Sequence, residues 1–252
     1  MIALEFPPIN EILRWKDLFP SFNKIALIAV AAALIGSIIF LLAGNKDPMK
    51  APKGVRNLAE TLVEFIENGI VMQTMGRDGL GWTPFLLSMF TFIYLCNVPG
   101  IIPFLQMPAT ARIAIPMFLS LLVWVVFICT GFKHQGIGYL KSSLFPPGVP
   151  NALYILVTPI EFISTFLVRP FSLTVRLFAN MLAGHILLVT FALLSEALFQ
   201  AKGNPALIPM GVLPLFMLIF LTGFEVLVAF LQAYIFTILT AVYIGGAAHP
   251  EH

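Results

Sequence analysis

The chain has 252 residues, of which 59% are hydrophobic and only 10% are charged, and its formal net charge is +2. Soluble domains average about 45–50% apolar and about 25% charged residues, so this composition excludes an ordinary soluble enzyme. It also excludes a disordered chain and a basic nucleic-acid-binding surface. The two cysteines, Cys96 and Cys129, lie in apolar segments and are too few for a disulfide framework.

The first apolar segment, residues 24–44, is long enough to cross a bilayer. It begins too far into the chain, and has the wrong flanks, for a cleaved signal peptide, so we predict a retained span. Residues 55–75 have a different pattern. Val55, Leu58 and Leu62 recur at helical spacing, and glutamates fall largely on the other side. This pattern predicts an amphipathic helix that lies on the membrane surface or packs against a partner.

Residues 84–132 contain two apolar blocks, each about one bilayer thick, which predict a transmembrane hairpin. Two much longer apolar tracts follow at about 152–199 and 207–245. As helices they would be roughly 70 and 60 Å long, about twice the thickness of a bilayer core. We therefore expect helices that are strongly tilted, broken or split. The whole chain, residues 1–252, is predicted to be one polytopic all-α membrane domain.

Positive charge predicts the orientation of these segments. Cytoplasmic loops carry an excess of Lys and Arg, and the segments after the first span and after the hairpin are the richer ones here. This modest bias places the surface helix on the cytoplasmic side and the N-terminus on the outer face. The basic residues on the cytoplasmic side are then Lys46, Lys50, Lys53, Arg56, Arg77, Lys133 and Lys141.

Polar and ionisable residues inside the two long tracts are the strongest functional candidates. A central arginine costs about 2.5–3.5 kcal/mol on membrane-insertion scales, so such a residue needs a partner or a water-filled cavity. The candidates are Glu161, Arg169, Arg176, Asn180, His185, Glu196, Glu225 and Gln232.

Helical geometry divides these candidates between faces. Arg176 and Asn180 share a face of the first tract, His185 points nearly the other way, and Glu225 and Gln232 share a face of the second. If the tracts pack antiparallel, His185 can approach Glu225, and Arg176 can approach Gln232. Glu and His titrate near neutrality when partly desolvated, whereas Arg keeps its charge. This set suits proton transfer between two regions separated by a fixed positive charge. Structural helix–helix contact is the alternative for each residue.

Three segments of the chain resemble subunit a of the F-type ATP synthase, the membrane stator beside the rotating c-ring. They are PFSLTVRLFANMLAGHILL at 170–188, LQAYIFTILTAVY at 231–243 and NVPGIIP at 97–103. The resemblance covers about residues 55–245. It implies one span, a surface helix, a hairpin and two long helices that lie steeply tilted along the c-ring.

The resemblance also implies roles for individual residues. Arg176 is similar to the family's essential arginine, which faces the c-ring carboxylate. His185 and Glu225 resemble a Glu–His pair on the path from the outer side, with Asn180 and Gln232 as polar companions near the half-channels. Glu161 looks like an acidic residue of the cytoplasmic half-channel.

The expected partners are the c-ring, b-type peripheral stalk subunits, other Fo and F1 subunits, the lipid bilayer and transported H⁺, but no nucleic acid. No cofactor or metal is expected. The chain is not itself expected to be catalytic, because no Lys-Ser/Thr follows Gly76, Gly79 and Gly81 to complete a phosphate loop. The expected location is the plasma membrane of a bacterium.

Other classes of protein remain as alternatives. A stand-alone proton-coupled transporter would show internal repeats, and none is evident. An intramembrane hydrolase would carry a motif such as H-E-x-x-H or G-x-S-x-G, and neither occurs. A purely structural membrane subunit leaves the cost of placing Arg176 in the membrane unexplained.

Overall fold

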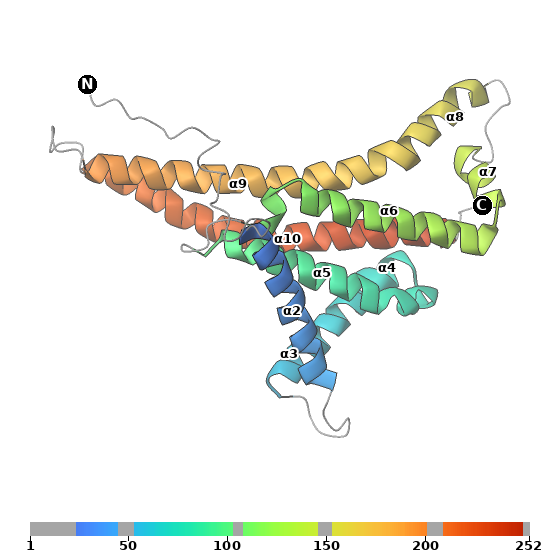
Figure 1. Cartoon of the computed structure of the whole chain (residues 1–252), viewed down its shortest axis with the longest axis horizontal. Coiled ribbons are helices and arrows are strands. Elements are labelled where there is room, and N and C mark those ends of the chain that lie inside the picture. The colour runs from blue at the N-terminus through green and yellow to red at the C-terminus, as the bar shows by residue number, and fades with distance from the viewer. Residues whose placement is uncertain (1–23, 45–52, 103–107, 146–152, 201–208, 249–252) are drawn as a thin grey trace.

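The computed structural model describes residues 24–44, 53–102, 108–145, 153–200 and 209–248 (Figure 1). All regular secondary structure in these ranges is helical. Five helical stretches among them are long and apolar enough to cross a membrane, which confirms the predicted all-α membrane fold class. These stretches are Lys24–Gly44, Arg77–Gly100, Ala114–Gln135, Tyr154–Phe199 and Pro209–Ala248.

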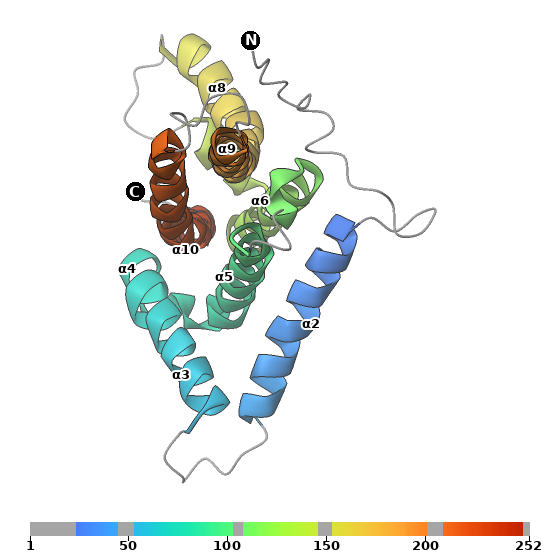
Figure 2. The ribbon, with the colours of Figure 1, turned by 90° about the vertical axis from the view of Figure 1, so that its left-hand side faces the viewer.

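Two N-terminal helices form the arms of a V in Figure 2. They are α2 (Lys24–Gly44) and α3 (Val55–Ile66). A π-helical turn, Glu67–Val71, links α3 to the short α4 (Met72–Thr74). Packing within the chain explains the amphipathic pattern of α3 only in part, because Ile66 is fully buried whereas Val55 and Leu58 of the apolar face are exposed.

The hairpin consists of α5 (Thr83–Asn97) and α6 (Ala114–Gln135). Pro84 lies in the first turn of α5, where its missing N–H has no intrahelical acceptor to lose. Two 3₁₀ turns belong to the connection between the helices, η3 (Val98–Gly100) and η4 (Ala109–Ala111).

The short α7 (Gly138–Leu144) folds back against the end of α6. Gly136 makes the turn with a φ of 59°, in the left-handed region that favours glycine. The ring of Tyr139 then lies against Gly131, and any side chain at Gly131 would overlap that ring. Burial raises the pKa of the Tyr139 hydroxyl, and the nearby positive charge of Arg169 opposes this shift.

The first long tract is continuous but bent. Its helices α8 (Tyr154–Ile163) and α9 (Arg169–Phe199) are joined by a π-helical turn, Ser164–Val168. Figure 1 shows α8 turning away from the axis of α9 at this point. Pro170 follows the wide turn, and it cannot donate the hydrogen bond that a regular helix would need there.

The second tract is a single helix, α10 (Val212–Ala248), which has 37 residues and runs beside α9 in both ribbon views. Both tracts are therefore continuous helices rather than pairs of separate spans.

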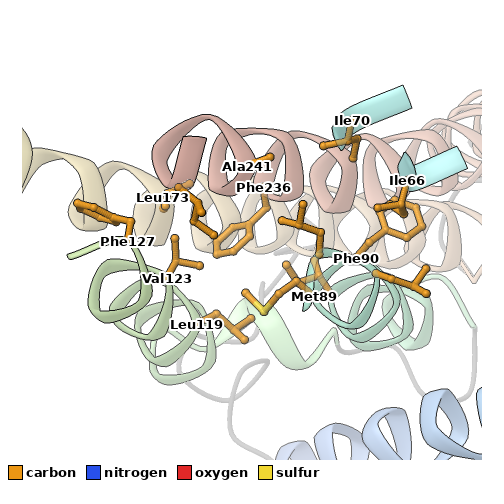
Figure 3. Close-up of a cluster of buried hydrophobic side chains, with 14 of the residues drawn as sticks. Ile66, Ile70, Met89, Phe90, Leu119, Val123, Phe127, Leu173, Phe236 and Ala241 are labelled. Atoms are coloured by element: carbon orange, nitrogen blue, oxygen red, sulfur yellow. The ribbon is translucent and has the colours of Figure 1, made fainter. Parts of the chain in front are cut away.

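The main core lies where α3, α5, α6, α9 and α10 meet (Figure 3). Phe90 comes from α5, Phe127 from α6, Leu173 from α9 and Phe236 from α10, and all four are buried. Lipid tails are as apolar as these side chains, so close packing rather than escape from water holds the helices together. This packing fixes α9 against α10 and α6, and it thereby positions the polar residues of the long helices.

Candidate functional site

Polar contacts between α9 and α10 show that the two helices are antiparallel. Asn180 Nδ2 donates a hydrogen bond of 2.8 Å to Gln232 Oε1. About three turns earlier on α9, the Arg169 guanidinium carbon lies 5.2 Å from the centre of the Tyr243 ring. As residue numbers fall along α9 they rise along α10, so the predicted antiparallel packing is present.

Glu225 is buried in this interface, and its carboxylate lies against the backbone of α9 at Gly184. A Cβ atom at Gly184 would overlap both carboxylate oxygens, so only glycine leaves room for Glu225 in this position. His185 is the next residue and is also buried. Within the described residues no hydrogen bond joins His185 to Glu225. We expected His185 to approach Glu225. In the structure it is the backbone at Gly184, next to His185, that lies against the Glu225 carboxylate.

Arg176 is half-buried and forms no hydrogen bond, ion pair or ring contact with any residue that the structure describes. It does not bond to Gln232, whose side-chain oxygen accepts from Asn180 instead. The Nε2 atom of Gln232 is buried and also lacks a partner in the described part of the chain. A guanidinium offers five N–H donors and no acceptor, so Arg176 is a positive charge that these residues do not satisfy.

Arg169 lies on the same helix, close to the same face, and has a different environment. Its guanidinium lies over the ring of Tyr243 from α10 and 6.0 Å from the ring of Phe127 from α6. Aromatic faces attract cations at this range. Arg169 therefore joins three helices at the point where α8 bends away.

The connection between α5 and α6 packs against the middle of α10. Thr110 donates a hydrogen bond to Asn97 Oδ1, and Asn97 Nδ2 makes a long contact of 3.5 Å with the carbonyl oxygen of Ala229. Ala111 joins Met181 of α9 in a small apolar cluster beside Ala229. These contacts pack the connection against α9 and α10 near Glu225.

A pocket of about 300 Å³ lies between this connection and the C-terminal half of α9. His185 lines it, although this residue is buried. The residues that line the pocket are Gly100, Ile101, His185, Leu188, Val189, Ala192, Leu193, Glu196, Leu218 and Thr222. A larger pocket of about 890 Å³, between α2, α5 and α6, has no ionisable side chain in its lining.

Glu161 stands apart from the other candidates. It is half-buried on α8, fifteen positions before Arg176, which is about 22 Å along a helix. The structure brings together Asn180, Gln232, Gly184 and Glu225, and it does not bring Glu161 to them. No group of three or more His, Cys, Asp or Glu side chains that suits a metal ion occurs among the described residues.

Comparison with known proteins decides the family. A sequence model described as ATP synthase A chain matches residues 25–245. ATP synthase subunit a of Frankia alni is 46% identical over 91% of this chain and 79% of its own length. The subunit a of Rhodococcus erythropolis is 41% identical over 91% and 83%, and that of Mesorhizobium japonicum is 38% identical over 99% and 94%.

The chain belongs to the ATP synthase subunit a family. The resemblance identified in the three sequence segments is thus confirmed, and the chain is the proton-translocating subunit of the Fo sector. Subunit a is part of a larger enzyme, so other Fo and F1 subunits are its partners. The bacterial relatives and the apolar helices indicate a bacterial membrane protein.

Two positions that shape the site of this subunit a are not identified from the sequence alone. Gly184 was not singled out, although it follows Ala183 directly before His185, and a small residue beside a predicted titratable group is a weak signal for close approach. Thr110 gave no signal, because its partner Asn97 lies 13 positions away across a non-helical connection.

Proposed function

We propose that this subunit a conducts protons through two offset half-channels and that Arg176 separates them. The outer path uses the pocket beside His185 and then Glu225, and the inner path passes Glu161. The observation that carries the proposal is Arg176, a permanently charged side chain in a membrane helix without a partner among the described residues. Such a charge is costly unless a carboxylate from another subunit meets it.

The partner that we propose for Arg176 is a carboxylate of the c-ring. The side of α9 beside Arg176 carries an exposed apolar row in which Ala179 and Ala183 are small enough to let another helix approach closely. Exposed apolar side chains also lie along both long helices. They include Phe171, Val175 and Leu187 of α9 and Phe216, Phe220, Phe224 and Leu227 of α10.

Charge and desolvation give the mechanism. A proton from the outer path neutralises a c-ring carboxylate, which lowers the cost of turning that carboxylate toward lipid. After nearly a full turn, the acid meets the inner path and releases its proton. Arg176 then favours the ionised carboxylate by charge attraction and blocks direct passage of protons between the two paths. The membrane potential supplies about 2.3 kcal/mol per charge per 100 mV.

We also propose which subunits hold subunit a in place and in which membrane the complex lies. The b-type peripheral stalk subunits hold subunit a against the torque of the ring, and the complex lies in the bacterial plasma membrane. Asn180 and Gln232 join α9 to α10 close to Arg176, since Asn180 is one helical turn beyond it and donates to Gln232.

The test compares Arg176→Ala with the unchanged chain in vesicles that carry the assembled complex. ATP-driven acidification and passive proton leak are both recorded, and assembly is checked by recovery of the other subunits. We expect coupled pumping to disappear while assembly persists and passive conduction remains or rises. Pumping near the wild-type rate would mean that Arg176 only joins helices, and the proposed mechanism would be wrong.

A further inference from the structure

The pocket beside His185 contains a second titratable side chain, which the proposed function does not use. Glu196 lies eleven positions after His185, which returns it to within about 20° of the same face of α9. Glu196 is exposed, whereas His185 is buried, and both line the same pocket. The pocket therefore has a carboxylate at its open end and an imidazole at its inner end.

We infer that Glu196 is the proton-collecting carboxylate at the outer mouth of the pocket and that it supplies His185. This inference rests on the proposed function, because it needs protons to enter on this side. The Glu196 carboxylate accepts a proton from outer water and becomes a neutral acid. The proton then passes along water to a ring nitrogen of neutral His185, which becomes an imidazolium, and Glu196 returns to its charged form. His185 next gives the proton toward Glu225.

The size of the pocket permits this transfer. Eleven residues of helix separate the two groups by about 16 Å. Hydrogen-bonded oxygens are about 2.8 Å apart, so five or so waters in a row span that distance. A water occupies about 30 Å³ in the liquid, so the 300 Å³ of the pocket holds about ten.

The pocket walls also offer polar support for water between the two ends. The Thr222 hydroxyl of α10 donates to the carbonyl oxygen of Leu218, which leaves its own oxygen free to accept a hydrogen bond from water. Gln200 Nε2 donates to Glu196 Oε1 at 2.9 Å. This bond orients the carboxylate and leaves its second oxygen for protons.

Apart from His185, no described residue that lines the pocket with Glu196 is titratable. His185 is the other titratable residue in the described lining, and α10 contributes only Leu218 and Thr222. The turn after α5 contributes Gly100 and Ile101, which are neutral. Arg112 is exposed beside η4 and does not line the pocket, and Lys202 lies outside the described residues.

The experiment measures ATP synthesis by the complete complex in proteoliposomes, with the total driving force held constant. The pH on the side of the Glu196 pocket is varied, and an added potassium potential compensates for each change. Glu196→Gln is compared with the unchanged chain, with Glu196→Asp, and with Glu64→Gln, which removes an exposed carboxylate from α3.

We expect Glu196→Gln to slow synthesis about tenfold when that side is alkaline, the lower end of the gain that a charged cleft gives to capture of an opposite charge. The rate should return to the wild-type value when that side is acidic, because proton capture then no longer limits turnover. Glu196→Asp should retain most of the alkaline rate, and Glu64→Gln should match the unchanged chain.

Two results would overturn the inference while the proposed function stands. One is a Glu196→Gln variant equal to wild type at every pH, and the other is a loss of the same size at every pH, which indicates a structural role. His185→Ala is measured alongside. If that variant synthesises ATP normally throughout, the proposed outer path is itself wrong, and the role of Glu196 is wrong with it.

Discussion

Arg169 and Arg176 lie on one helix but differ in whether other described residues of this chain contact their guanidinium groups. Arg169 lies over the rings of Tyr243 and Phe127, which belong to two other helices of the same chain. Arg176 is seven residues further on and makes no such contact with any described residue. Both are arginines in an apolar helix, so the cost of insertion is similar for each. An arginine that is contacted within the chain can stabilise the fold. We propose that an arginine without such contacts acts on a group outside the chain.

The surroundings of the two side chains support this distinction. Arg169 lies where α6, α7, α9 and α10 converge, near Tyr139, whose ring packs against Gly131. Arg176 lies at the edge of an exposed apolar face that includes Ala179. In the first region, the guanidinium group is contacted by residues of the same chain. The second has no such contacts among the described residues, which suits the proposed contact with a carboxylate of the c-ring.

The largest expected effect comes from the same conservative substitution at both positions. Arg176→Lys should reduce coupled proton pumping to background, because lysine gives up its proton when desolvated and lacks the planar fork that pairs with a carboxylate. Arg169→Lys should pump nearly as the unchanged chain does, because an ammonium also binds to aromatic faces. ATP-driven acidification of vesicles measures both. Equal losses at the two positions would remove the distinction between them.

A smaller loss is expected when the contact between Gly184 and Glu225 is disturbed. Gly184→Ala places a methyl group where the Glu225 carboxylate lies, and this carboxylate, as the end of a flexible side chain, can swing aside at little cost in stability. Displacement of a reacting group by about 1 Å can cost on the order of a hundredfold in rate, so we expect pumping to fall about tenfold or more when the Glu225 carboxylate moves. Gly223→Ala is the matched control, because no atom lies within 4 Å of its added Cβ. Similar pumping by the two variants would show that the position of Glu225 is not critical.

A change in stability rather than transport is expected from Arg169→Met. Loss of the cation from its two rings should lower the free energy of unfolding by about 1–2 kcal/mol, and pumping per assembled complex should persist. Thermal unfolding in detergent measures the first quantity, and vesicle acidification measures the second. Tyr243→Leu should be nearly non-additive with Arg169→Met, because each removes the same contact. Additive losses would indicate that the two side chains act separately.

The sequence predicted this division only in part. Periodicity and length were sufficient for the all-helical membrane fold, and the cost of buried charge singled out Arg176 without any structure. Helical-wheel geometry puts Asn180 on the face of Arg176, but the approach that it predicts for Gln232 is by Arg176, whereas the structure has Asn180 bonded to Gln232. The choice depends on the axial register of α9 and α10, which packing in the core sets.

Other features depended on the path of the backbone. The aromatic environment of Arg169 requires Phe127 and Tyr243, which lie 42 positions before it and 74 positions after it in the sequence. The space that Gly184 leaves for Glu225 depends on how closely the two helices approach. The bend before Arg169 arises from a π-helical turn, Ser164–Val168, and the expectation of a tilted, broken or split helix does not locate it. Residue spacing within one helix cannot determine any of these three features.

The smallest expected effect tests whether Asn180 and Gln232 belong with the fold or with Arg176. Asn180→Ala and Gln232→Ala each remove one end of a hydrogen bond of 2.8 Å, and such bonds between membrane helices average about 0.6 kcal/mol of coupling. A double-mutant cycle on the free energy of unfolding should return a coupling of about that size. If the pair serves only the fold, the two single variants pump equally. If Gln232 also contacts a group outside the chain through its unpartnered Nε2, Gln232→Ala should pump more slowly than Asn180→Ala at equal loss of stability. That second result would place Gln232 beside Arg176 among the residues that are completed by another subunit.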